Sequence, residues 1–253
     1  MGALSRRQES LVRALRQRHG RRESELCLCD GLRSGSEIIS LRPDLLEMVI
    51  LRSGVSLDLN LPIEPVILSP EEFDRVAACV HSQGILVIAR RPALKALDEP
   101  VKDPFVLVLD RVGDPGNFGT IIRTARAVGL HDLWLTKGCV DPFSDKVLRS
   151  ASGAQFALSI RVADNLESLA KSLHANGIHT VFRTLPAGGE NVFCVKDLFE
   201  RSAIVLGCEA TGVAEMDHSR SLNIPMPGSA ESLNVAQAAT VILFEYVRRM
   251  TAV

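Results

Sequence analysis

The stretch Ile224-Pro-Met-Pro-Gly-Ser-Ala-Glu-Ser-Leu-Asn234 runs directly into Val235-Ala-Gln-Ala-Ala-Thr-Val-Ile-Leu-Phe-Glu-Tyr246. It joins a short apolar strand, a loop with two prolines and one glycine, and a long apolar helix predicted over 232–250. The first backbone N–H groups of a helix have no partner within the helix. The Ser-Leu-Asn triplet sets polar side chains beside these free N–H groups, and this combination indicates a binding site.

Length and composition are those of an ordinary globular protein. The chain has 253 residues, enough for one large or two modest domains, and a formal net charge of -1. No apolar run reaches the roughly 18 residues of a membrane span, and no segment resembles a signal peptide. The six cysteines form no C-x-x-C pair and share no metal-ligand spacing with the histidines, so we expect reduced thiols and no metal. We therefore expect a cytoplasmic protein without membrane contact.

Residues 1–22 form a basic arm, in which seven arginines stand against one acidic residue, Glu9. Apolar residues at 4, 11, 12 and 15 have helical spacing, which predicts a helix over 4–19 that Gly20 ends. Three interpretations of the arm stay open. It can neutralise phosphates, it can be a solvated helix, or it can be an organellar transit peptide, since it is rich in arginine and poor in acidic residues.

Short strands and helices alternate after the arm. Residues 23–91 predict a small α/β domain. Its strands are expected at 25–29, 46–51, 65–68 and 84–89, and its helices at 34–41 and 70–80. Residues 92–104 contain three prolines and five charged residues, a composition typical of a linker.

The alternation resumes and stays regular over a second domain, residues 105–253. This order predicts an α/β fold with a mostly parallel sheet and helices on both faces. Strands are expected at 105–109, 132–136, 156–161, 178–182, 203–207 and 222–226. Helices are expected at 119–128, 145–151, 164–176, which Asp164 would cap, and 232–250.

The loop Asp110-Arg-Val-Gly-Asp-Pro-Gly-Asn-Phe-Gly-Thr120 leaves a buried strand and opens a helix. In open α/β sheets, ligands bind at the carboxyl ends of strands. The glycine spacing of this loop matches neither a dinucleotide fingerprint nor a P-loop. Arg123 and Arg126 lie three residues apart on the more exposed side of the helix, where they suit a phosphate. A capped helix, with Asn117 near the cap and both arginines in water, explains the pattern equally well.

Two further loops also follow apolar strands. Gly207-Cys-Glu-Ala-Thr-Gly212 places the Glu209 carboxylate just past a buried strand, as a ligand contact or as an ordinary turn residue. In the stretch 224–234, helix capping by Ser232 with Asn234 in the first turn is also a sufficient explanation. Each loop alone therefore leaves the function open.

Together and in order, the three loops resemble the signature motifs of the SpoU-type RNA ribose 2′-O-methyltransferases of the SPOUT superfamily. The matching segments are Val108-Leu-Asp-Arg-Val-Gly-Asp-Pro-Gly-Asn-Phe-Gly-Thr-Ile-Ile-Arg-Thr-Ala125, Ile204-Val-Leu-Gly-Cys-Glu-Ala-Thr-Gly212, and Ile224-Pro-Met226 through Ser232-Leu-Asn234. Lys146 to Ala154 is similar to the segment between the first two motifs, so the resemblance spans about residues 104–250. More loosely, residues 21–91, with Cys29-Asp-Gly-Leu-Arg33, resemble the L30e-like substrate-binding domain that often precedes this catalytic domain.

The resemblance implies a deep trefoil knot, S-adenosyl-L-methionine (AdoMet) as the cofactor, and a homodimer whose site takes residues from both subunits. The helix that follows Asn234 would then belong to the dimer interface. The cofactor positions of the family fall on Thr184, Leu185, Gly207, Ile224, Met226 and Leu233. Its polar site positions fall on Asn117 and Glu209, expected to organise the site across the dimer, on Ser232 and Asn234, expected to hold the motif-three loop, and on Arg123.

The implied reaction is attack of a ribose 2′-hydroxyl on the sulfonium methyl, which makes RNA the expected substrate. A guanidinium is a poor base, so we expect Arg123 to hold the adjacent phosphate and to stabilise the developing alkoxide. The additional N-terminal domain favours ribosomal RNA over tRNA by analogy. RNA contacts are expected at Arg123, Arg126, Arg13, Arg16, Arg21, Arg22 and Arg33.

Two other functions compete with this interpretation. One is a catalytically silent RNA-binding relative, which the intact set of polar site positions disfavours. The other is an α/β enzyme with a different nucleotide cofactor, which the absent dinucleotide fingerprint disfavours.

Overall fold

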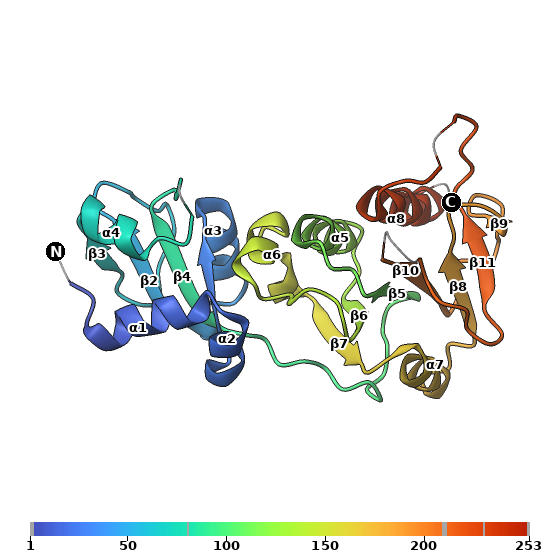
Figure 1. Cartoon of the computed structure of the whole chain (residues 1–253), viewed down its shortest axis with the longest axis horizontal. Helices are drawn as coiled ribbons and strands as arrows, with labels where there is room; N and C mark the ends of the chain where they lie inside the picture. Colours follow the sequence, from blue (N-terminus) through green and yellow to red (C-terminus); the bar gives the residue numbers. More distant parts are fainter. Residues whose placement is uncertain (1–2, 80, 209–211, 230, 252–253) are drawn as a thin grey trace. The chain divides into compact units, whose positions relative to one another are not determined.

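The computed structural model describes residues 3–79, 81–208, 212–229 and 231–251, and it divides into two compact units (Figure 1). The first unit comprises Met1–Pro92 and Asp141–Ala157, and the second comprises Ala93–Val140 and Leu158–Val253. The segment 141–157 had been expected within the C-terminal domain. The first unit is therefore built from two separate stretches of the chain.

The first unit contains a mixed four-stranded sheet in the order β1-β4-β2-β3. β4 pairs antiparallel with β1 and β2, whereas β3 pairs parallel with β2. The strands are β1 (Leu26–Asp30), β2 (Leu46–Arg52), β3 (Val66–Leu68) and β4 (Ile85–Arg90). The helices are α1 (Arg6–Leu15), α2 (Arg18–Ser24), α3 (Leu32–Leu41), α4 (Pro70–Val76) and α6 (Asp145–Ser150), with 3-10 turns at Pro43–Leu45 and Ala154–Ala157.

The central strand β4 is buried on both faces because its side chains alternate between two helical layers. Leu86 and Ile88 pack in one cluster with Val12 of α1 and Phe73 of α4. On the other face Val87 lies against Gly35 of α3, where a Cβ atom would approach Val87 Cγ2 to 3.0 Å. The continuous apolar run in 84–89, which predicted a strand, is thus covered on both faces.

The basic arm is not one helix. α1 ends at Leu15, and α2 begins after Gln17, whose backbone is extended. Gly20 lies inside α2 and does not end a helix. A Cβ atom on Gly20 would lie 2.3 Å from the carbonyl oxygen of Ala14, so glycine allows the two helices to approach closely.

The expectation that Arg21 contacts RNA is wrong, because its side chain is buried within the first unit. Only 5% of the residue is exposed. Its Nε and Nη2 atoms donate to Asp141 Oδ2 at 2.9 and 2.7 Å, and Nη1 donates to the carbonyl of Leu15 at 3.0 Å. Arg16 remains exposed, but its guanidinium donates to the carbonyls of Val76 and Ala77. The arm is therefore part of the fold of this unit, since these two arginines bind protein groups.

The helix predicted over 70–80 ends earlier, at Val76. The buried Asp30 carboxylate accepts hydrogen bonds from the backbone N–H groups of Ala78 and Cys79, at 2.7 and 2.9 Å. These N–H groups therefore point away from a continuing helix. The capping box at Ser69 and Glu72 begins the helix where the sequence predicted it.

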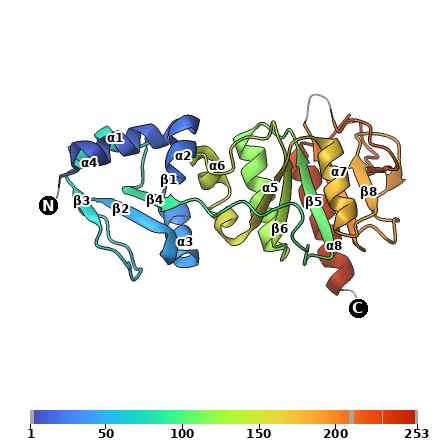
Figure 2. The ribbon, with the colours of Figure 1, turned by 90° about the horizontal axis from the view of Figure 1, so that it is seen from below.

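The second unit contains a seven-stranded parallel sheet in the order β7-β6-β5-β10-β8-β11-β9. Figures 1 and 2 show α5 and α8 on one face of this sheet and α7 on the other. The strands are β5 (Phe105–Asp110), β6 (Asp132–Thr136), β7 (Ser159–Ala163), β8 (Thr180–Thr184), β9 (Glu190–Asn191), β10 (Ser202–Gly207) and β11 (Arg220–Asn223). The helices are α5 (Pro115–Ala127), α7 (Leu166–Ala175) and α8 (Val235–Thr251).

Several predicted boundaries are shifted because turns and caps differ from those expected. The strand expected at 156–161 begins at Ser159, since a 3-10 turn occupies Ala154–Ala157. The strand expected at 222–226 is β11 and ends at Asn223. Asn165 caps α7, whereas the expected cap, Asp164, pairs with Lys137.

The predicted trefoil knot stays a prediction, because strand order does not define whether the chain passes through a loop.

The segment 92–104, expected as a linker, is anchored in the second unit. The buried Arg161 side chain donates to the carbonyls of Ala96 and Glu99 at 2.6 and 2.7 Å.

Across the described ranges, the helices are too short or too polar to cross a bilayer. All six cysteines are free thiols, and Cys194 is the exposed one.

Candidate active site

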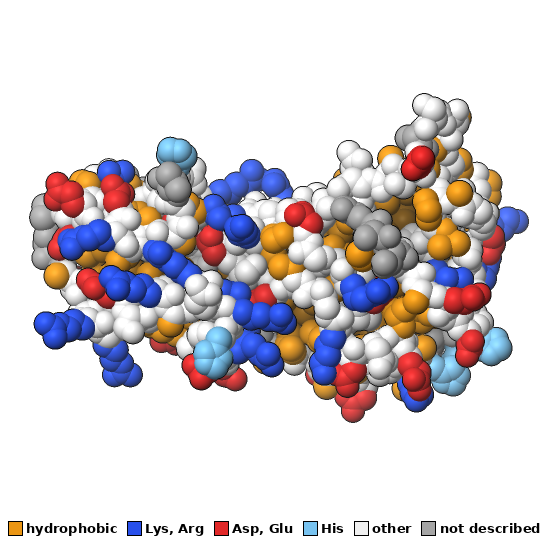
Figure 3. Space-filling model, in the orientation of Figure 1, with side chains coloured by type: hydrophobic (Ala, Val, Ile, Leu, Met, Phe, Trp, Pro, Cys, Tyr) orange, Lys and Arg blue, Asp and Glu red, His pale blue; other side chains and the backbone are white. Residues whose placement is uncertain are grey.

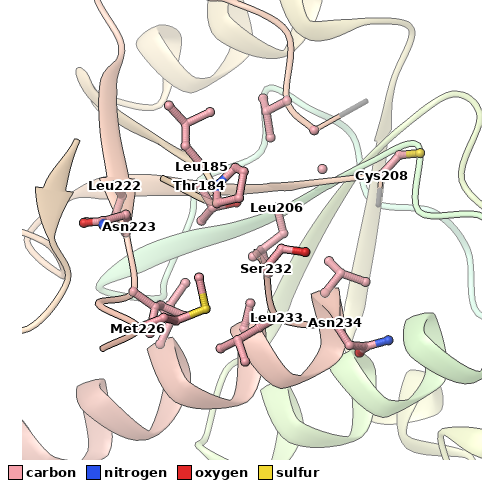
Figure 4. A pocket seen from close by; sticks show the side chains of 18 residues that line it. Thr184, Leu185, Leu206, Cys208, Leu222, Asn223, Met226, Ser232, Leu233 and Asn234 are labelled. Atoms are coloured by element: carbon pink, nitrogen blue, oxygen red, sulfur yellow. The ribbon is translucent and has the colours of Figure 1, made fainter. Parts of the chain in front are cut away.

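A pocket of about 580 Å³ opens at the carboxyl ends of β8, β10 and β11 and at the first turns of α8 (Figure 4). Pockets that hold small-molecule ligands range over about 300–1,000 Å³. The pocket is lined by Thr184, Leu185, Pro186, Leu206, Gly207, Cys208, Gly212, Val213, Leu222, Asn223, Ile224, Met226, Ser232, Leu233, Asn234, Val235, Ala238 and Ile242.

The end of β8 is fixed between its two neighbouring strands. The hydroxyl of Thr184 donates to the carbonyl of Val205 in β10 at 3.0 Å. On the other side, the N–H group of Leu185 donates to the carbonyl of Leu222 in β11 at 2.8 Å. The backbone that lines this part of the pocket is therefore held by hydrogen bonds on both sides.

Gly207 ends β10 where the chain turns back on itself. A Cβ atom on Gly207 would lie 2.5 Å from the carbonyl carbon of Gly212, so no other residue fits without moving the backbone. The N–H of Gly212 donates to the carbonyl of Cys208 at 2.8 Å. The predicted site residue Glu209 lies outside the described residues.

Asn234 caps α8, whereas the sequence had suggested Ser232 as the capping residue. Its Oδ1 atom accepts hydrogen bonds from the N–H groups of Ala236 and Gln237, at 2.9 and 3.4 Å. Its Nδ2 atom donates to Oδ1 of Asn117 at 3.0 Å. One side chain therefore begins a helix and connects motif three to motif one.

The start of α5 is capped one turn before the expected residue. Asp114 is the N-cap, and its Oδ1 atom accepts the N–H of Asn117 at 2.7 Å. Pro115 occupies the first helical position, which suits its fixed backbone angle. The side chain of Asn117 is thereby aimed at the start of α8, where it meets Asn234.

The six residues predicted as cofactor positions, Thr184, Leu185, Gly207, Ile224, Met226 and Leu233, all line the pocket. Ser232 and Asn234 line it as well. Within the described chain, Asn117, Arg123 and Arg126 do not belong to the lining. Arg123 is exposed on the outer side of α5, and Arg126 is half-buried. The structure thus gathers the predicted cofactor residues in one pocket, whereas the predicted phosphate-binding arginines lie outside its lining, on α5.

The sequence interpretation missed the apolar wall of the pocket. Val235, Ala238 and Ile242 lie on one side of α8, at the three- and four-residue spacing that brings helical side chains together. Leu206 and Leu222 complete the wall from β10 and β11. The sequence interpretation assigns the helix after Asn234 to the dimer interface, and not to the pocket. The nearness of these apolar residues to the motif residues was the signal that could have identified them.

Two groups beside β5, the Arg111 guanidinium and the Cys139 thiol, each keep one protonation state at physiological pH. The hydrogen bond to Asp110 raises the pKa of Arg111, so its guanidinium stays charged. Burial raises the pKa of Cys139 to about 11, and its thiol donates to the carbonyl of Leu109. This thiol is therefore neutral at physiological pH and is a poor nucleophile.

A parallel sheet with a pocket of this size at its carboxyl edge defines an α/β domain that binds a small molecule or cofactor. Residues 104–244 match the model of the SpoU rRNA Methylase family, and the chain belongs to that family. The family resemblance predicted from the three motifs is thus confirmed.

Relatives extend the similarity over both units. The chain is 36% identical over 190 residues to the 23S rRNA (guanosine(2553)-2′-O)-methyltransferase RlmP of Bacillus subtilis, which covers 74% of each chain. The structure of a putative RNA methyltransferase of the TrmH family from Porphyromonas gingivalis matches with a TM-score of 0.82 at 28% identity, over 98% of this chain and 100% of that one. The SpoU methyltransferase AviRb of Streptomyces viridochromogenes, solved with AdoMet, matches with a TM-score of 0.80 at 27% identity, over 98% and 100%.

Proposed function

We propose that the protein is an AdoMet-dependent ribose 2′-O-methyltransferase that acts on ribosomal RNA. The observation that carries the proposal is the convergence of two separate signature motifs and the end of β8 on one pocket of suitable size. The relative RlmP is named for 2′-O-methylation of 23S rRNA, and the structural neighbour AviRb was solved with AdoMet. Both relationships support the same chemistry for this chain.

The groups around the pocket fit AdoMet. The side chains of Leu206, Leu233 and Ile242 offer an apolar surface for an adenine ring. The strand ends at Thr184 and Asn223 place backbone polar groups beside this surface, where hydroxyl, amino and carboxylate groups need partners. When bound, AdoMet supplies a methyl group activated by its sulfonium charge.

The protein contributes mainly by positioning the ribose hydroxyl. Holding two reacting groups in line removes much of the entropic barrier. Arg123 is exposed on α5, and Asn117 in the first turn of the same helix is tied to the pocket residue Asn234. In this arrangement Arg123 holds an RNA phosphate and stabilises the alkoxide that develops on the ribose.

Transfer of a labelled methyl group from AdoMet to rRNA tests the function directly. We expect label on ribose 2′-oxygens of rRNA and none on tRNA. Arg123→Lys keeps the charge but loses the planar fork that binds phosphate, so turnover should fall about 100-fold while AdoMet affinity is kept. Unchanged turnover in this variant would remove Arg123 from the mechanism.

The same assay separates the alternatives. Label on tRNA alone would identify a tRNA enzyme and overturn the rRNA assignment. Binding of AdoMet and RNA without methyl transfer to any RNA would identify a silent relative. Comparing 2′-O-methyl positions in rRNA from cells with and without the gene would then name the target nucleotide.

Homodimerisation through the C-terminal helix belongs to the same proposal. Phe244 and Met250 of α8 are 53% and 62% exposed, an unusual exposure for large apolar side chains of one helix. A second copy that covers them would remove this surface from water. Light scattering should give twice the mass of the chain, and a monomer at micromolar concentration would contradict the proposal.

RNA contact by the first unit is proposed at Arg13, Arg22 and Arg33, all of which are exposed. On the face drawn in Figure 3, basic side chains are spread over this unit with acidic ones between them. Each phosphate contact that is removed should weaken the salt dependence of RNA binding. Equal salt slopes for wild type and Arg13→Met would exclude that contact.

A cytoplasmic location also stays a prediction, which fractionation of cells can check.

A further inference from the structure

Arg111, the first residue after β5, has a backbone conformation that is unusual for a residue with a side chain. Its φ angle is +54°, in the left-handed region. The surrounding groups hold it there. Its N–H donates to Thr136 Oγ1 at 3.2 Å, and the same hydroxyl donates to Asp110 Oδ1 at 2.6 Å. The turn is therefore fixed by groups from two neighbouring strands.

The Arg111 side chain connects the end of β5 to the end of motif two. Its Nε and Nη2 atoms donate to Asp110 Oδ2 at 3.1 and 3.0 Å, and Nη2 also donates to the carbonyl of Gly212 at 3.3 Å. Asp110 is only 2% exposed, so the carboxylate is a rigid anchor. The aliphatic stem of Arg111 passes close to Gly138, where an added Cβ atom would lie 3.0 Å from Arg111 Cγ.

The Gly212 carbonyl belongs to a short piece of chain that forms one wall of the pocket. Gly212 has a φ angle of +63°, and its N–H group donates to the carbonyl of Cys208. The backbones of Gly207 and Gly212 pack closely, because a Cβ atom on Gly207 would lie 2.5 Å from the carbonyl carbon of Gly212. All three residues and Val213 line the pocket. The position of the Gly212 carbonyl thus sets the position of this wall.

The chain beyond Gly212 is held from the opposite side by a second arginine. Arg183 of β8 donates from Nε to Ser219 Oγ at 2.7 Å and from Nη1 to the carbonyl of Ala214 at 3.4 Å. Between the two arginines, Val213 is buried in the core of the second unit. Arg111 and Arg183 therefore fix the two ends of one segment, 212–219.

We propose that Arg111 is a positioning residue for the cofactor pocket, which holds the wall formed by Gly207, Cys208, Gly212 and Val213 in the shape that binds AdoMet. This inference rests on the proposed function, because it assigns AdoMet to the pocket. The guanidinium acts through the Gly212 carbonyl and does not touch the reacting atoms. Its loss should therefore weaken cofactor binding and leave the chemical step largely intact.

A matched control lies at the other end of the same sheet. Arg201 precedes β10, has a φ angle of +50° and donates from Nη2 to the carbonyl of Asn176 at 2.7 Å. A Cβ atom on Gly177 would approach its Nη2 to 3.0 Å. Arg201 thus repeats the conformation and the carbonyl contact of Arg111 away from the pocket.

The experiment measures AdoMet binding by calorimetry and methyl transfer to rRNA for wild type, Arg111→Met, Arg111→Lys and Arg201→Met. Loss of one charge-assisted hydrogen bond predicts an about tenfold higher Kd and KM for AdoMet in Arg111→Met, with kcat changed less than about threefold. Arg111→Lys keeps a charge beside Asp110 and should lie between wild type and Arg111→Met. Arg201→Met should bind AdoMet like wild type.

Four results would overturn the inference. An unchanged AdoMet Kd in Arg111→Met would show that the wall needs no support from this side chain. An equal loss in Arg201→Met would show a general loss of folding. A fall in kcat at constant KM would place Arg111 in the chemical step. If wild type itself binds no AdoMet, the proposed function fails and takes the inference with it. Equal AdoMet affinity of wild type and Arg111→Met removes only the role of Arg111.

Discussion

The two edges of the parallel sheet in the second unit use polar groups in opposite ways. At the carboxyl edge, the ends of β8, β10 and β11 open onto a pocket. At the amino edge, the polar groups bind one another. Asp103 accepts the N–H groups of His131 and Asp132, both at 2.8 Å. The first edge therefore keeps groups available for a ligand, and the second satisfies them within the protein.

Arg161 shows how completely the amino edge is closed. The residue is 0% exposed, and it donates to Asp132 Oδ1 at 3.0 Å in addition to carbonyls of the segment 96–100. Its guanidinium also lies over the ring of Trp134, 5.1 Å from the centroid. A buried charge is tolerated because every direction around it offers a partner. Substitutions at this edge should change stability, whereas substitutions at the pocket should change binding.

Arg161→Met should have the largest effect of the changes considered. It leaves Asp132, which is 2% exposed, without its closest partner and removes the guanidinium donors to the carbonyls of Ala96, Glu99 and Pro100. Breaking a buried ion pair on one side costs about 3–5 kcal/mol in the free energy of unfolding. Urea unfolding measures the loss. The exposed Lys171→Met, which removes a surface pair with Glu167, is the control and should cost under about 0.5 kcal/mol. A similar loss in both variants would contradict the closed amino edge.

Gly207→Ala should break the pocket while sparing most of the fold. The added Cβ atom would meet the backbone of Gly212 and Val213 at 2.5 and 2.6 Å, so the wall must move. Misplacing a binding wall should raise the Kd for AdoMet more than about tenfold. Gly228→Ala is the matched control, because its Cβ atom would have no neighbour within 4 Å. Calorimetry with AdoMet compares the two, and equal affinities would place the cofactor elsewhere.

Glu245 provides a pH test of the amino edge, where the last turns of α8 pack. Hydrogen bonds from Arg248 and then Arg249 lower the pKa of Glu245 to about 2 from its ordinary value of 4.5. A lowered pKa means that the stabilisation is present above pH 4.5 and is lost as the pH falls toward 2. Glu245→Gln should therefore cost about 1–2 kcal/mol in the free energy of unfolding at pH 7.

The difference between wild type and Glu245→Gln should shrink as the pH falls from 4.5 toward 2, because the unfolded wild type binds a proton at Glu245 below pH 4.5 and the folded protein does so only near pH 2. Urea unfolding at several pH values measures it. Glu167→Gln removes an exposed carboxylate with a weaker effect and serves as control. A difference that does not depend on pH would mean that Glu245 acts through packing alone.

Substitutions of Asn234 should have the smallest effect on stability. They separate its two contacts, the cap of α8 and the hydrogen bond to Asn117. Asn234→Ala removes the cap of α8 and the hydrogen bond to Asn117, whereas Asn234→Ser keeps a capping oxygen. Loss of the cap costs about 1 kcal/mol, so only the alanine variant should lower the unfolding midpoint clearly. Both variants should lower methyl transfer if the contact with Asn117 matters. Full activity of Asn234→Ser would assign Asn234 to capping only.

The sequence predicted the order of the elements well, and it predicted bounds best for strands that are fully buried. The strand predicted at 132–136 is β6 within the same bounds, because the apolar residues Leu133, Trp134 and Leu135 stand together at the centre of a buried strand. The second and third motifs also marked half of the described residues that line the pocket, whereas the first motif contributes none of them. These features are local, so a local pattern suffices to predict them.

Features that depend on contacts between separate elements were not predicted. Nothing in the arm shows that Arg21 finds Asp141, 120 residues later, and is buried with it. Gly20 resembles a helix stop, and only the approach of Ala14 explains it. The assignment of 141–157 to the first unit likewise depends on contacts such as that of Asp145 with the N–H of Asp30. In each case a tertiary contact overrides the local pattern.

Hydrogen exchange with and without AdoMet tests the central claim, that the two edges of one sheet are divided between binding and stability. We predict that AdoMet slows exchange in the segments 184–186, 222–224 and 233–236, which line the pocket or follow it. The segments 103–105, 131–132 and 201–203 at the amino edge should not change. Slowed exchange at the amino edge, or none in the pocket segments of a protein that binds AdoMet, would contradict the account.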